Sequence, residues 1–374
     1  MKTHLSRAFL LLPLVFLSSC GTAKSVVISD YFDETIAYKS NFRLLQLTDL
    51  HWSVNTNAVT AGAYLTQVVK AANPDFIMIT GDLLLGASSS TAETLAGIIN
   101  SWKVPYGITW GNHDREGEYS PSWLSKLFSS GEYSHYNEVN DDLFGRSNYV
   151  ISLMDQTTKK ATWNIYSIDS NSYPASATGI YYDYDVIHDD QIDWFKKAAA
   201  YSTQKNGRVV PGMTYFHIPL FQWYYAYLQD QIGKIGEVLE TSTNSLAPED
   251  VKKQYAEKGL KVKFWPGYKD TGYFDAGVEN GIKGFFCGHD HSNDWGTTYS
   301  DAAGKAYIGY GVKSTKELYY THGSDTRGVM RNYDIIGGSL SILHDDGTFD
   351  LTHYYVQMDE AYTTYTETIT EANL

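Results

Sequence analysis

The sequence predicts a fold of the α/β class, and the first signal is a strand–helix–strand pattern in its N-terminal third. Residues 41–47 alternate apolar and polar side chains, whereas residues 75–80 form a nearly continuous apolar run. Between them, residues 58–72 carry apolar side chains at helical spacing and stop before Asn73-Pro74, which is typical of a helix end. This order of elements indicates a βαβ unit with parallel strands.

The second signal is the spacing of polar residues at the ends of the expected strands. Asp49, Asp82 and Asn112 follow one another at intervals of 33 and 30 residues, each close to one crossover from a strand through a helix to a parallel neighbour. In sheets of this kind, ligands bind outside the carboxyl ends of the strands. We therefore expect these three side chains at one edge of a sheet.

The remaining elements follow along the chain. We expect helices at 91–102 and 189–200, strands at 104–110, 163–168, 213–216 and 283–286, and a C-terminal hairpin of 339–343 with 348–355. Two longer stretches, 115–160 and 219–280, are expected to be surface excursions, and the second contains a helical pattern at 248–258. The aromatic run at 221–227 is expected to pack or to line a substrate entrance.

Size, charge and cysteine content limit the classes of function. The chain has 374 residues, of which 43% are apolar, and this suffices for a large core. The formal net charge of −14 at pH 7 repels nucleic acid backbones, so we expect no nucleic-acid partner. Only Cys287 lies outside the N-terminal segment, so we expect no internal disulfide.

The first twenty residues have the pattern of an export signal. Lys2 and Arg7 precede an apolar run at 8–17, which is too short to span a bilayer. Leu17-Ser18-Ser19-Cys20-Gly21 follows and resembles the lipobox of bacterial lipoproteins. That resemblance implies that Cys20 is diacylated, becomes the new N-terminus and anchors an exported protein to a membrane. The alternative is an ordinary cleaved signal that ends near a chance cysteine.

These observations divide the chain into four parts. We expect a lipoprotein signal peptide at 1–20, a tether at 21–40 that includes a first edge element, one large domain at 41–356 and a C-terminal tail at 357–374. No stretch after the signal is apolar enough to be a transmembrane helix.

Five short motifs rich in histidine and aspartate stand in order along the chain. They are Asp49-Leu50-His51, Gly81-Asp82, Gly111-Asn112-His113-Asp114, His217 and Gly288-His289-Asp290-His291. Seven of their side chains offer oxygen or nitrogen ligands, which is enough for two metal ions that share one carboxylate. Side chains two apart on an extended segment point the same way, so Asp49 and His51 should address one locus, as should His289 and His291. Carboxylates and imidazoles suit Mn, Fe or Zn.

The five motifs in this order resemble those of the calcineurin-like metallophosphoesterase superfamily, over about residues 42–295. The resemblance implies a four-layer α/β/β/α sandwich with mixed sheets and a site for two divalent or trivalent transition-metal ions. It implies that the first ion is bound by Asp49, His51, Asp82 and His291. It implies that the second ion is bound by Asp82, Asn112, His217 and His289.

Two strings, at 110–115 and 288–295, are similar to those of non-purple relatives of the purple acid phosphatases. The chain departs from the purple enzymes at His51, where they have glycine, and at Leu85, where they have a metal-binding tyrosine. Without a tyrosinate ligand, we expect no purple charge-transfer colour.

The resemblance also implies a mechanism. Two ions in such a site activate a bridging water, and the resulting hydroxide attacks phosphorus in line with the leaving oxygen. His113 would stabilise the transition state or protonate the leaving alkoxide, and Asp114 would orient the His113 ring. Candidate substrate contacts are Asn112, Arg115, Asn171, Tyr173 and Asn293, although Arg115 suits a solvated salt bridge equally well.

We therefore expect a metal-dependent hydrolase of phosphoric esters. A phosphomonoesterase is favoured because the resemblance is to phosphatases, and a phosphodiesterase of the same fold is the first alternative. The second alternative is a surface-binding lipoprotein that keeps the fold but does no chemistry. It is disfavoured because no ligand of the family pattern is missing.

Overall fold

The computed structural model describes residues 26–139, 142–174, 184–226, 265–291, 293–315, 335–357 and 363–369. The expected signal peptide with Cys20, and the helical pattern at 248–258, lie outside the described residues. All seven side chains that we expect to bind metal lie within them.

Two mixed sheets face each other at the centre of the molecule. In the described part of the chain, the seven-stranded sheet has the order β1 (Glu34–Ala37), β5 (Tyr149–Met154), β6 (Ala161–Ser167), β7 (Gly212–Tyr215), β8 (Ile282–Cys287), β10 (Gly304–Tyr310) and β9 (Gly296–Asp301). The six-stranded sheet has the order β13 (Thr363–Ile369), β12 (Phe349–Gln357), β11 (Ile335–Leu343), β2 (Phe42–Leu47), β3 (Phe76–Thr80) and β4 (Tyr106–Thr109). β2, β3 and β4 are parallel, as their crossover spacing predicted, and β11 runs antiparallel to β2.

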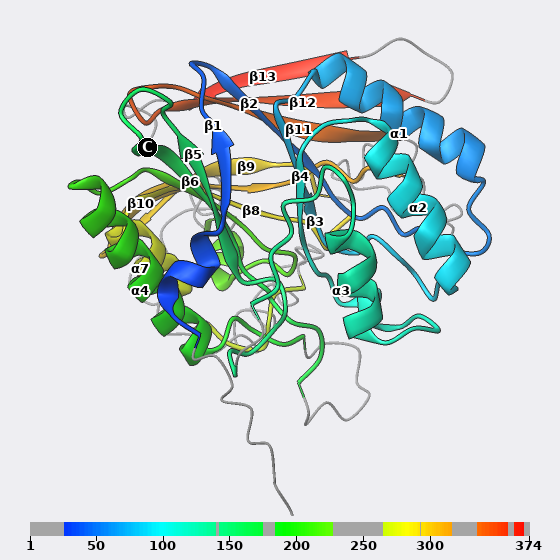
Figure 1. The fold of residues 1–374 in the computed structure, drawn as a ribbon, viewed down its shortest axis with the longest axis horizontal. Helices are drawn as coiled ribbons and strands as arrows, with labels where there is room; N and C mark the ends of the chain where they lie inside the picture. The colour runs from blue at the N-terminus through cyan, green and yellow to red at the C-terminus, as the bar shows by residue number, and fades with distance from the viewer. Residues whose placement is uncertain are drawn as a thin grey trace, which may run out of the picture.

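Helices cover the outer faces of both sheets (Figure 1). α1 (Ala58–Ala72), α2 (Ser89–Ser101) and α3 (Pro121–Ser129) lie on the side of the six-stranded sheet, and α4 (Asp189–Asn206) and α7 (Tyr273–Glu279) lie on the side of the seven-stranded sheet. One apolar core joins α1 and α2 to the space between the sheets, and a second fills the gap between the seven-stranded sheet and its helices. The four-layer α/β/β/α sandwich is therefore confirmed.

Local sequence sets the ends of α1, the crossover helix between β2 and β3. The side chain of Asn57 caps its first turn by accepting a hydrogen bond from the Thr60 N–H (3.1 Å). At the other end, Asn73 adopts a left-handed conformation with φ of 43°, and Pro74 cannot continue the helix. The bounds predicted for this helix, 58–72, are confirmed.

Several strands lie in segments for which no strand was predicted or only an edge element was expected. The stretch 115–160 contains α3 and β5, and β5 pairs antiparallel with β6. β1 is the edge element expected within 21–40, and it pairs with β5. β13 lies within 357–374, the segment expected to be a C-terminal tail, and pairs with β12. β1 has only four residues, and its pairing with β5, which is distant in the sequence, stabilises it.

The aromatic run that begins at Phe221 packs into the second core. Trp223, Tyr224 and Tyr225 are all buried, and the ring of Trp223 meets the ring of Phe216 with centroids 5.7 Å apart. Packing is thus the role that the structure supports for these side chains. Tyr227 lies outside the described residues.

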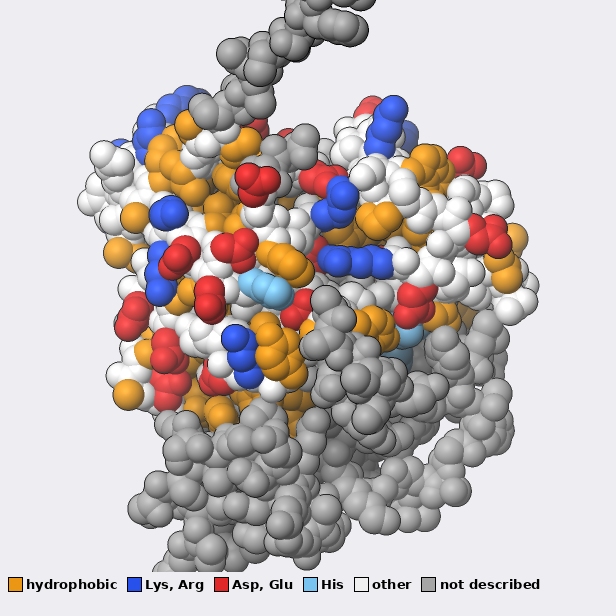
Figure 2. Space-filling view, turned by 90° about the horizontal axis from the view of Figure 1, so that it is seen from below, with side chains coloured by type: hydrophobic (Ala, Val, Ile, Leu, Met, Phe, Trp, Pro, Cys, Tyr) orange, Lys and Arg blue, Asp and Glu red, His pale blue; other side chains and the backbone are white. Residues whose placement is uncertain are grey.

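Charges of both signs are mixed on the described surface. The face in Figure 2 shows Lys and Arg side chains interspersed with Asp and Glu. Elsewhere on the surface, basic side chains are paired, as in the contact of Lys39 Nζ with Asp75 Oδ1 (2.6 Å). Exposed pairs of this kind contribute little to stability.

Candidate metal centre

The five motifs follow five strands that come from both sheets. Asp49, Asp82 and Asn112 come after the carboxyl ends of β2, β3 and β4, whereas His217 and His289 come after those of β7 and β8. Because these strands are parallel within each sheet, their ends meet at the same edge of the sandwich. Side chains from both sheets thus converge on one locus.

The converging side chains form two groups with one member in common. In each group the candidate ligand atoms lie within 4.8 Å of one another. The first group is Asp49, His51, Asp82 and His291, and the second is Asp82, His217 and His289. Asp82 therefore lies where a carboxylate could serve two cations.

The shortest contacts of the two groups surround the Asp82 carboxylate. Its Oδ2 lies 3.1 Å from His217 Nε2 and 3.3 Å from His51 Nε2. In the first group, His291 Nε2 lies 3.2 Å from Asp49 Oδ1. In the second group, His289 Nδ1 lies 3.3 Å from His217 Nε2. Both groups are thus compact enough for one ion each.

A buried polar atom indicates that these residues fit metal ions. Oδ1 of Asn112 is buried and has no hydrogen-bond partner. Buried polar atoms are almost always satisfied in native proteins, and each exception calls for an explanation. Asn112 is one of the side chains expected around the second ion, and a cation would satisfy its Oδ1. The oxygen and imidazole donors also suit Mn, Fe or Zn.

Hydrogen bonds to the backbone fix the orientation of these side chains. Nδ1 of His217 donates to the Thr80 carbonyl oxygen (2.8 Å), which turns its Nε2 toward Asp82. The Thr48 hydroxyl donates to Asp49 Oδ2 (2.9 Å), and the His289 N–H donates to the same carboxylate (3.1 Å). The site is therefore organised by the protein itself.

The backbone of the site is left-handed at several non-glycine positions, which corrects one of our expectations. Asp49 and His51 have φ values of 53° and 46°, so their segment is not extended. Asp82 and His289 have φ values of 48° and 76°. Such conformations cost energy and tend to occur at functional sites. The pair Asp49 and His51 therefore reaches one locus through a tight turn, not through strand alternation.

The buried charges of the site shift one another's pKa values. Burial by itself would raise the pKa of Asp49, but the charge and hydrogen bond of His291, together with the charge of His217, outweigh burial and lower the pKa to about 2. Burial would lower the pKa of His217, but the charge and hydrogen bond of Asp82, together with the charge of Asp49, outweigh burial and raise the pKa to about 9. Burial and then the neighbouring His217 hold the pKa of His289 well below its usual range. The carboxylates therefore stay ionised and attract positive charge.

His113 is positioned by Glu116, not by Asp114. Nδ1 of His113 lies 2.7 Å from Glu116 Oε2, and the backbone N–H of His113 donates to Asp82 Oδ1 (2.9 Å). Asp114 instead accepts from the backbone N–H groups of Leu84 and Gly111, at 3.0 and 2.8 Å. The predicted orienting role of Asp114 is wrong, because adjacent side chains on a helical turn diverge.

The pKa values of His113 and Asp114 follow from these contacts. Burial opposes protonation of His113, but the charges of Asp82 and Glu116 outweigh it and raise the pKa of the ring. Burial, followed by the charge of Asp82, raises the pKa of Asp114 to about 7. The buried Asp114 carboxylate thus holds the backbone of Leu84 and Gly111 in place.

Three of the candidate substrate contacts have partners within the protein. Arg115 Nη2 lies 3.0 Å from Asp169 Oδ2, which is the salt bridge that we considered for it. The Asn171 amide donates to the Val186 carbonyl oxygen (2.8 Å). The buried Asn293 donates its N–H to the Asp290 carbonyl oxygen (2.8 Å). These contacts give the three residues structural roles.

Tyr173 is the candidate that reaches the site, and sequence reasoning missed a neighbour of it. The Tyr173 hydroxyl accepts a hydrogen bond from Nδ2 of Asn112 (3.4 Å). The Tyr184 ring stacks on Tyr173 and also meets the ring of His289. No sequence pattern marks Tyr184. Glu116, also missed, follows His113 by three residues, and this spacing within a turn was an available signal.

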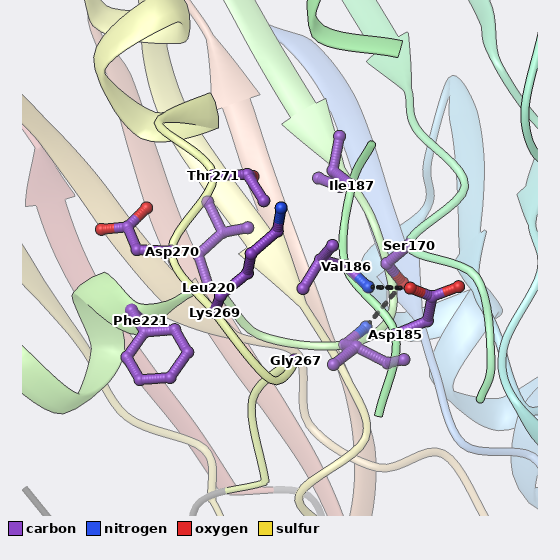
Figure 3. Close-up of a pocket in the computed structure, with 11 residues that line it drawn as sticks. Ser170, Asp185, Val186, Ile187, Leu220, Phe221, Gly267, Lys269, Asp270 and Thr271 are labelled. Atoms are coloured by element: carbon purple, nitrogen blue, oxygen red, sulfur yellow. Dashed lines mark hydrogen bonds between the residues drawn. The ribbon is translucent and has the colours of Figure 1, made fainter. Parts of the chain in front are cut away.

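A small pocket adjoins the backbone of His217 (Figure 3). The Ser170 hydroxyl oxygen, which lines it, accepts hydrogen bonds from the backbone N–H groups of His217 (3.2 Å) and Ile218 (2.8 Å). Asp185 and Val186 line the same pocket opposite Lys269. These hydrogen bonds show that the loop after β6 holds the loop that carries His217 in place.

Comparison with known proteins now places the chain in a family. A family model described as calcineurin-like phosphoesterase matches residues 42–293. The chain belongs to this family. Together with the two ligand groups, family membership supports a metal-dependent phosphoesterase.

Curated relatives include phosphatases and purple acid phosphatase-like proteins. The chain is 25% identical to Phosphatase DCR2 of Saccharomyces cerevisiae over 73% of its own length and 48% of the yeast protein, so it spans about half the length of that relative. It is 25% identical to Probable inactive purple acid phosphatase 29 of Arabidopsis thaliana, over 72% of this chain and 73% of that one. A solved dimetal phosphatase from Danio rerio is 12% identical, with a TM-score of 0.49 over 89% of this chain and 100% of that one.

The close packing of the motif glycines generates a prediction. A side chain at Gly288 would collide with Thr48 Oγ1 and would come within 2.6 Å of Asp49 Oδ2. We expect Gly288→Ala to displace Asp49 and to lower metal content, as measured by elemental analysis of dialysed protein. Gly97→Ala is the matched control, because a side chain there meets nothing within 4 Å. Unchanged metal content in Gly288→Ala would show that the proposed ligands do not need this close approach.

Proposed function

We propose that this protein is a phosphomonoesterase that uses two transition-metal ions of the Mn, Fe or Zn type. The observation that carries the proposal is the buried Asp82 carboxylate, which belongs to two groups of candidate ligands. In the proposal, the first ion is held by Asp49, His51, Asp82 and His291. The second ion is held by Asp82, Asn112, His217 and His289.

The proposed chemistry divides between the ions and the protein. When bound, two such ions would supply an activated water and positive charge for the phosphoryl oxygens. His113 would donate a proton to the leaving oxygen through Nε2, because its Nδ1 is held by Glu116. The hydrogen bond and charge of Glu116 raise the pKa of His113 and favour the protonated ring, which suits a general acid. Asp114 would keep the backbone of the Asn112 and His113 motif in place.

A monoester is favoured over a diester because the motif strings resemble those of phosphatases. A phosphodiesterase of the same fold is the first alternative. A catalytically silent protein is the second, and the printed name of the Arabidopsis relative, a probable inactive phosphatase, is the observation in its favour. Against it, every ligand position of the family pattern is filled in this chain.

The shared role of Asp82 generates a prediction. Asp82→Asn should lose both metals and lower kcat/KM by more than about 100-fold, because even outer-shell changes at metal sites cost about 10- to 100-fold. Metal equivalents per chain and hydrolysis of p-nitrophenyl phosphate are measured on the same preparation. Asp193→Asn, an exposed change on α4, is the control and should keep both values. Retention of two metals by Asp82→Asn would refute the shared role.

A panel of esters separates the three candidate functions. Metal-analysed protein is assayed with p-nitrophenyl phosphate and with bis(p-nitrophenyl) phosphate. We expect a higher kcat/KM for the monoester. Preference for the bis ester would establish the phosphodiesterase instead. A protein with two bound metals that hydrolyses neither ester would be the silent form.

We also propose that the protein is exported and held at a membrane by acyl chains on Cys20. The basic residues Lys2 and Arg7, the apolar run at 8–17 and the lipobox-like string support this location. In the described part of the chain, we find no helix that combines the length and apolarity needed to cross a bilayer. Two acyl chains would be needed for stable anchoring, since one holds a protein only marginally.

The anchor generates a prediction in a bacterial host. Cys20→Ala should abolish incorporation of labelled palmitate and move the protein from the membrane fraction to the soluble fraction. Cys287→Ala is the control, because this thiol is buried in β8. Equal labelling of the Cys20→Ala protein and the unaltered protein would rule out the lipid anchor.

A further inference from the structure

Two tyrosines that the proposed reaction does not use lie against the second group of ligands. The Tyr173 hydroxyl accepts from Nδ2 of Asn112 (3.4 Å). The Tyr184 ring meets the His289 ring edge-on, with centroids 4.3 Å apart and planes at 86°. The two tyrosine rings stack with centroids 5.4 Å apart and planes at 27°. Tyr173 and Tyr184 form one aromatic surface beside Asn112 and His289, and we call it the aromatic platform.

The platform extends from the buried site to the surface. Asn112 is fully buried and His289 is buried, whereas Tyr184 is partly buried and Tyr173 is 47% exposed. Few large apolar side chains of the described residues are as exposed as Tyr173. A phosphate held at the proposed ligands would thus have an accessible ring beside its ester oxygen.

The chain that carries Tyr173 is anchored to its surroundings. Asn171 has a left-handed backbone with φ of 68°, and its amide donates to the Val186 carbonyl oxygen (2.8 Å). The Ser172 hydroxyl donates to the Asn112 carbonyl oxygen (3.2 Å). The segment before Tyr173 is therefore tied both to the proposed ligand loop and to the segment after Tyr184.

The chain that carries Tyr184 is anchored as well. Tyr184 forms a parallel bridge with Gly267, and its carbonyl oxygen accepts from the Tyr268 N–H (2.9 Å). Figure 3 shows the next residues, Asp185 and Val186, beside Gly267. A side chain on Gly267 would collide with the Asp185 carbonyl oxygen, so the two backbones are in close contact. The backbone that carries both rings is held in place before a ligand binds. This reduces the conformational entropy lost on binding.

We propose that the aromatic platform binds a planar aromatic part of the leaving group. The preferred substrates are then phosphate monoesters that carry an aromatic ring, either a phenol or the base of a nucleotide, in place of an aliphatic alcohol. The inference rests on the proposed function, because that function fixes where phosphorus lies. Flat rings stack on exposed tyrosines through dispersion and quadrupole interactions, which aliphatic chains match less well. Tyr173 is the specificity residue in this proposal.

The test compares Tyr173→Leu, which removes the ring, with Tyr173→Phe, which keeps it. kcat/KM is measured for phenyl phosphate, for a nucleoside monophosphate and for glycerol phosphate. The ratio of aromatic to aliphatic ester is compared between variants, so that the intrinsic reactivity of each leaving group cancels. We expect Tyr173→Leu to lower this ratio by about 5- to 100-fold, mainly through KM, and Tyr173→Phe to keep it. The ester whose ratio falls more identifies the phenol or the nucleotide as the source.

A matched control uses another exposed ring. Phe144 is 44% exposed and stacks on His188 with centroids 3.8 Å apart, away from the proposed ligands. Phe144→Leu should keep the aromatic-to-aliphatic ratio. If Tyr173→Leu also keeps it while glycerol phosphate is hydrolysed, the platform proposal is wrong and the proposed function stands.

A binding measurement separates the platform from catalysis. Calorimetry on the metal-loaded protein compares phenylphosphonate with methylphosphonate, neither of which is hydrolysed. We expect tighter binding of the phenyl compound and loss of this preference in Tyr173→Leu. If both expectations hold but no ester is hydrolysed, the proposed function is overturned and the aromatic platform remains supported as a binding surface. Equal affinity for the two phosphonates would overturn the platform.

Discussion

Burial of two carboxylates next to each other is the constraint on which the rest of the structure depends. Asp49 and Asp82 are almost completely excluded from solvent, and removing charges from water is costly unless they are paired. His291 and His217 supply the pairing, and their charges keep the pKa values of both carboxylates below the ordinary value even though burial alone would raise them. Imidazoles lose this charge at high pH, whereas metal ions do not. A site of this composition is therefore built for cations.

The sandwich makes this burial possible because strand ends from both sheets meet at one edge. A buried amide connects the sheets beneath the site: Nε2 of Gln46 in β2 donates to Thr80 Oγ1 (2.8 Å) and to the Cys287 carbonyl oxygen (3.0 Å). Thr80 also holds His217 through its carbonyl oxygen. Polar contacts in a low-dielectric interior are strong when they are satisfied. The loops that carry the proposed ligands are therefore held in place by hydrogen bonds with both sheets.

The sequence predicted the proposed metal ligands better than it predicted the residues that hold or adjoin them. The strings around Asn112 and His289 are rich in ligand types, and their spacing agrees with parallel crossovers, so both fold class and site were readable. The partner of His113 was missed although Glu116 follows it by three residues, because that spacing indicates a contact only if the two residues share a turn. Tyr184 reaches His289 only through tertiary packing. The left-handed backbone at Asp49 was not predicted for a different reason. It arises from the close approach of the loops that carry the ligands, and not from the local conformational preference of the sequence.

The central claim is that two cations share Asp82, and anomalous scattering from crystals of the metal-loaded protein tests it most directly. The account predicts two anomalous peaks that both contact the Asp82 carboxylate. One should lie among Asp49, His51 and His291, and the other among Asn112, His217 and His289. A single peak, or two peaks without Asp82 between them, would contradict the account.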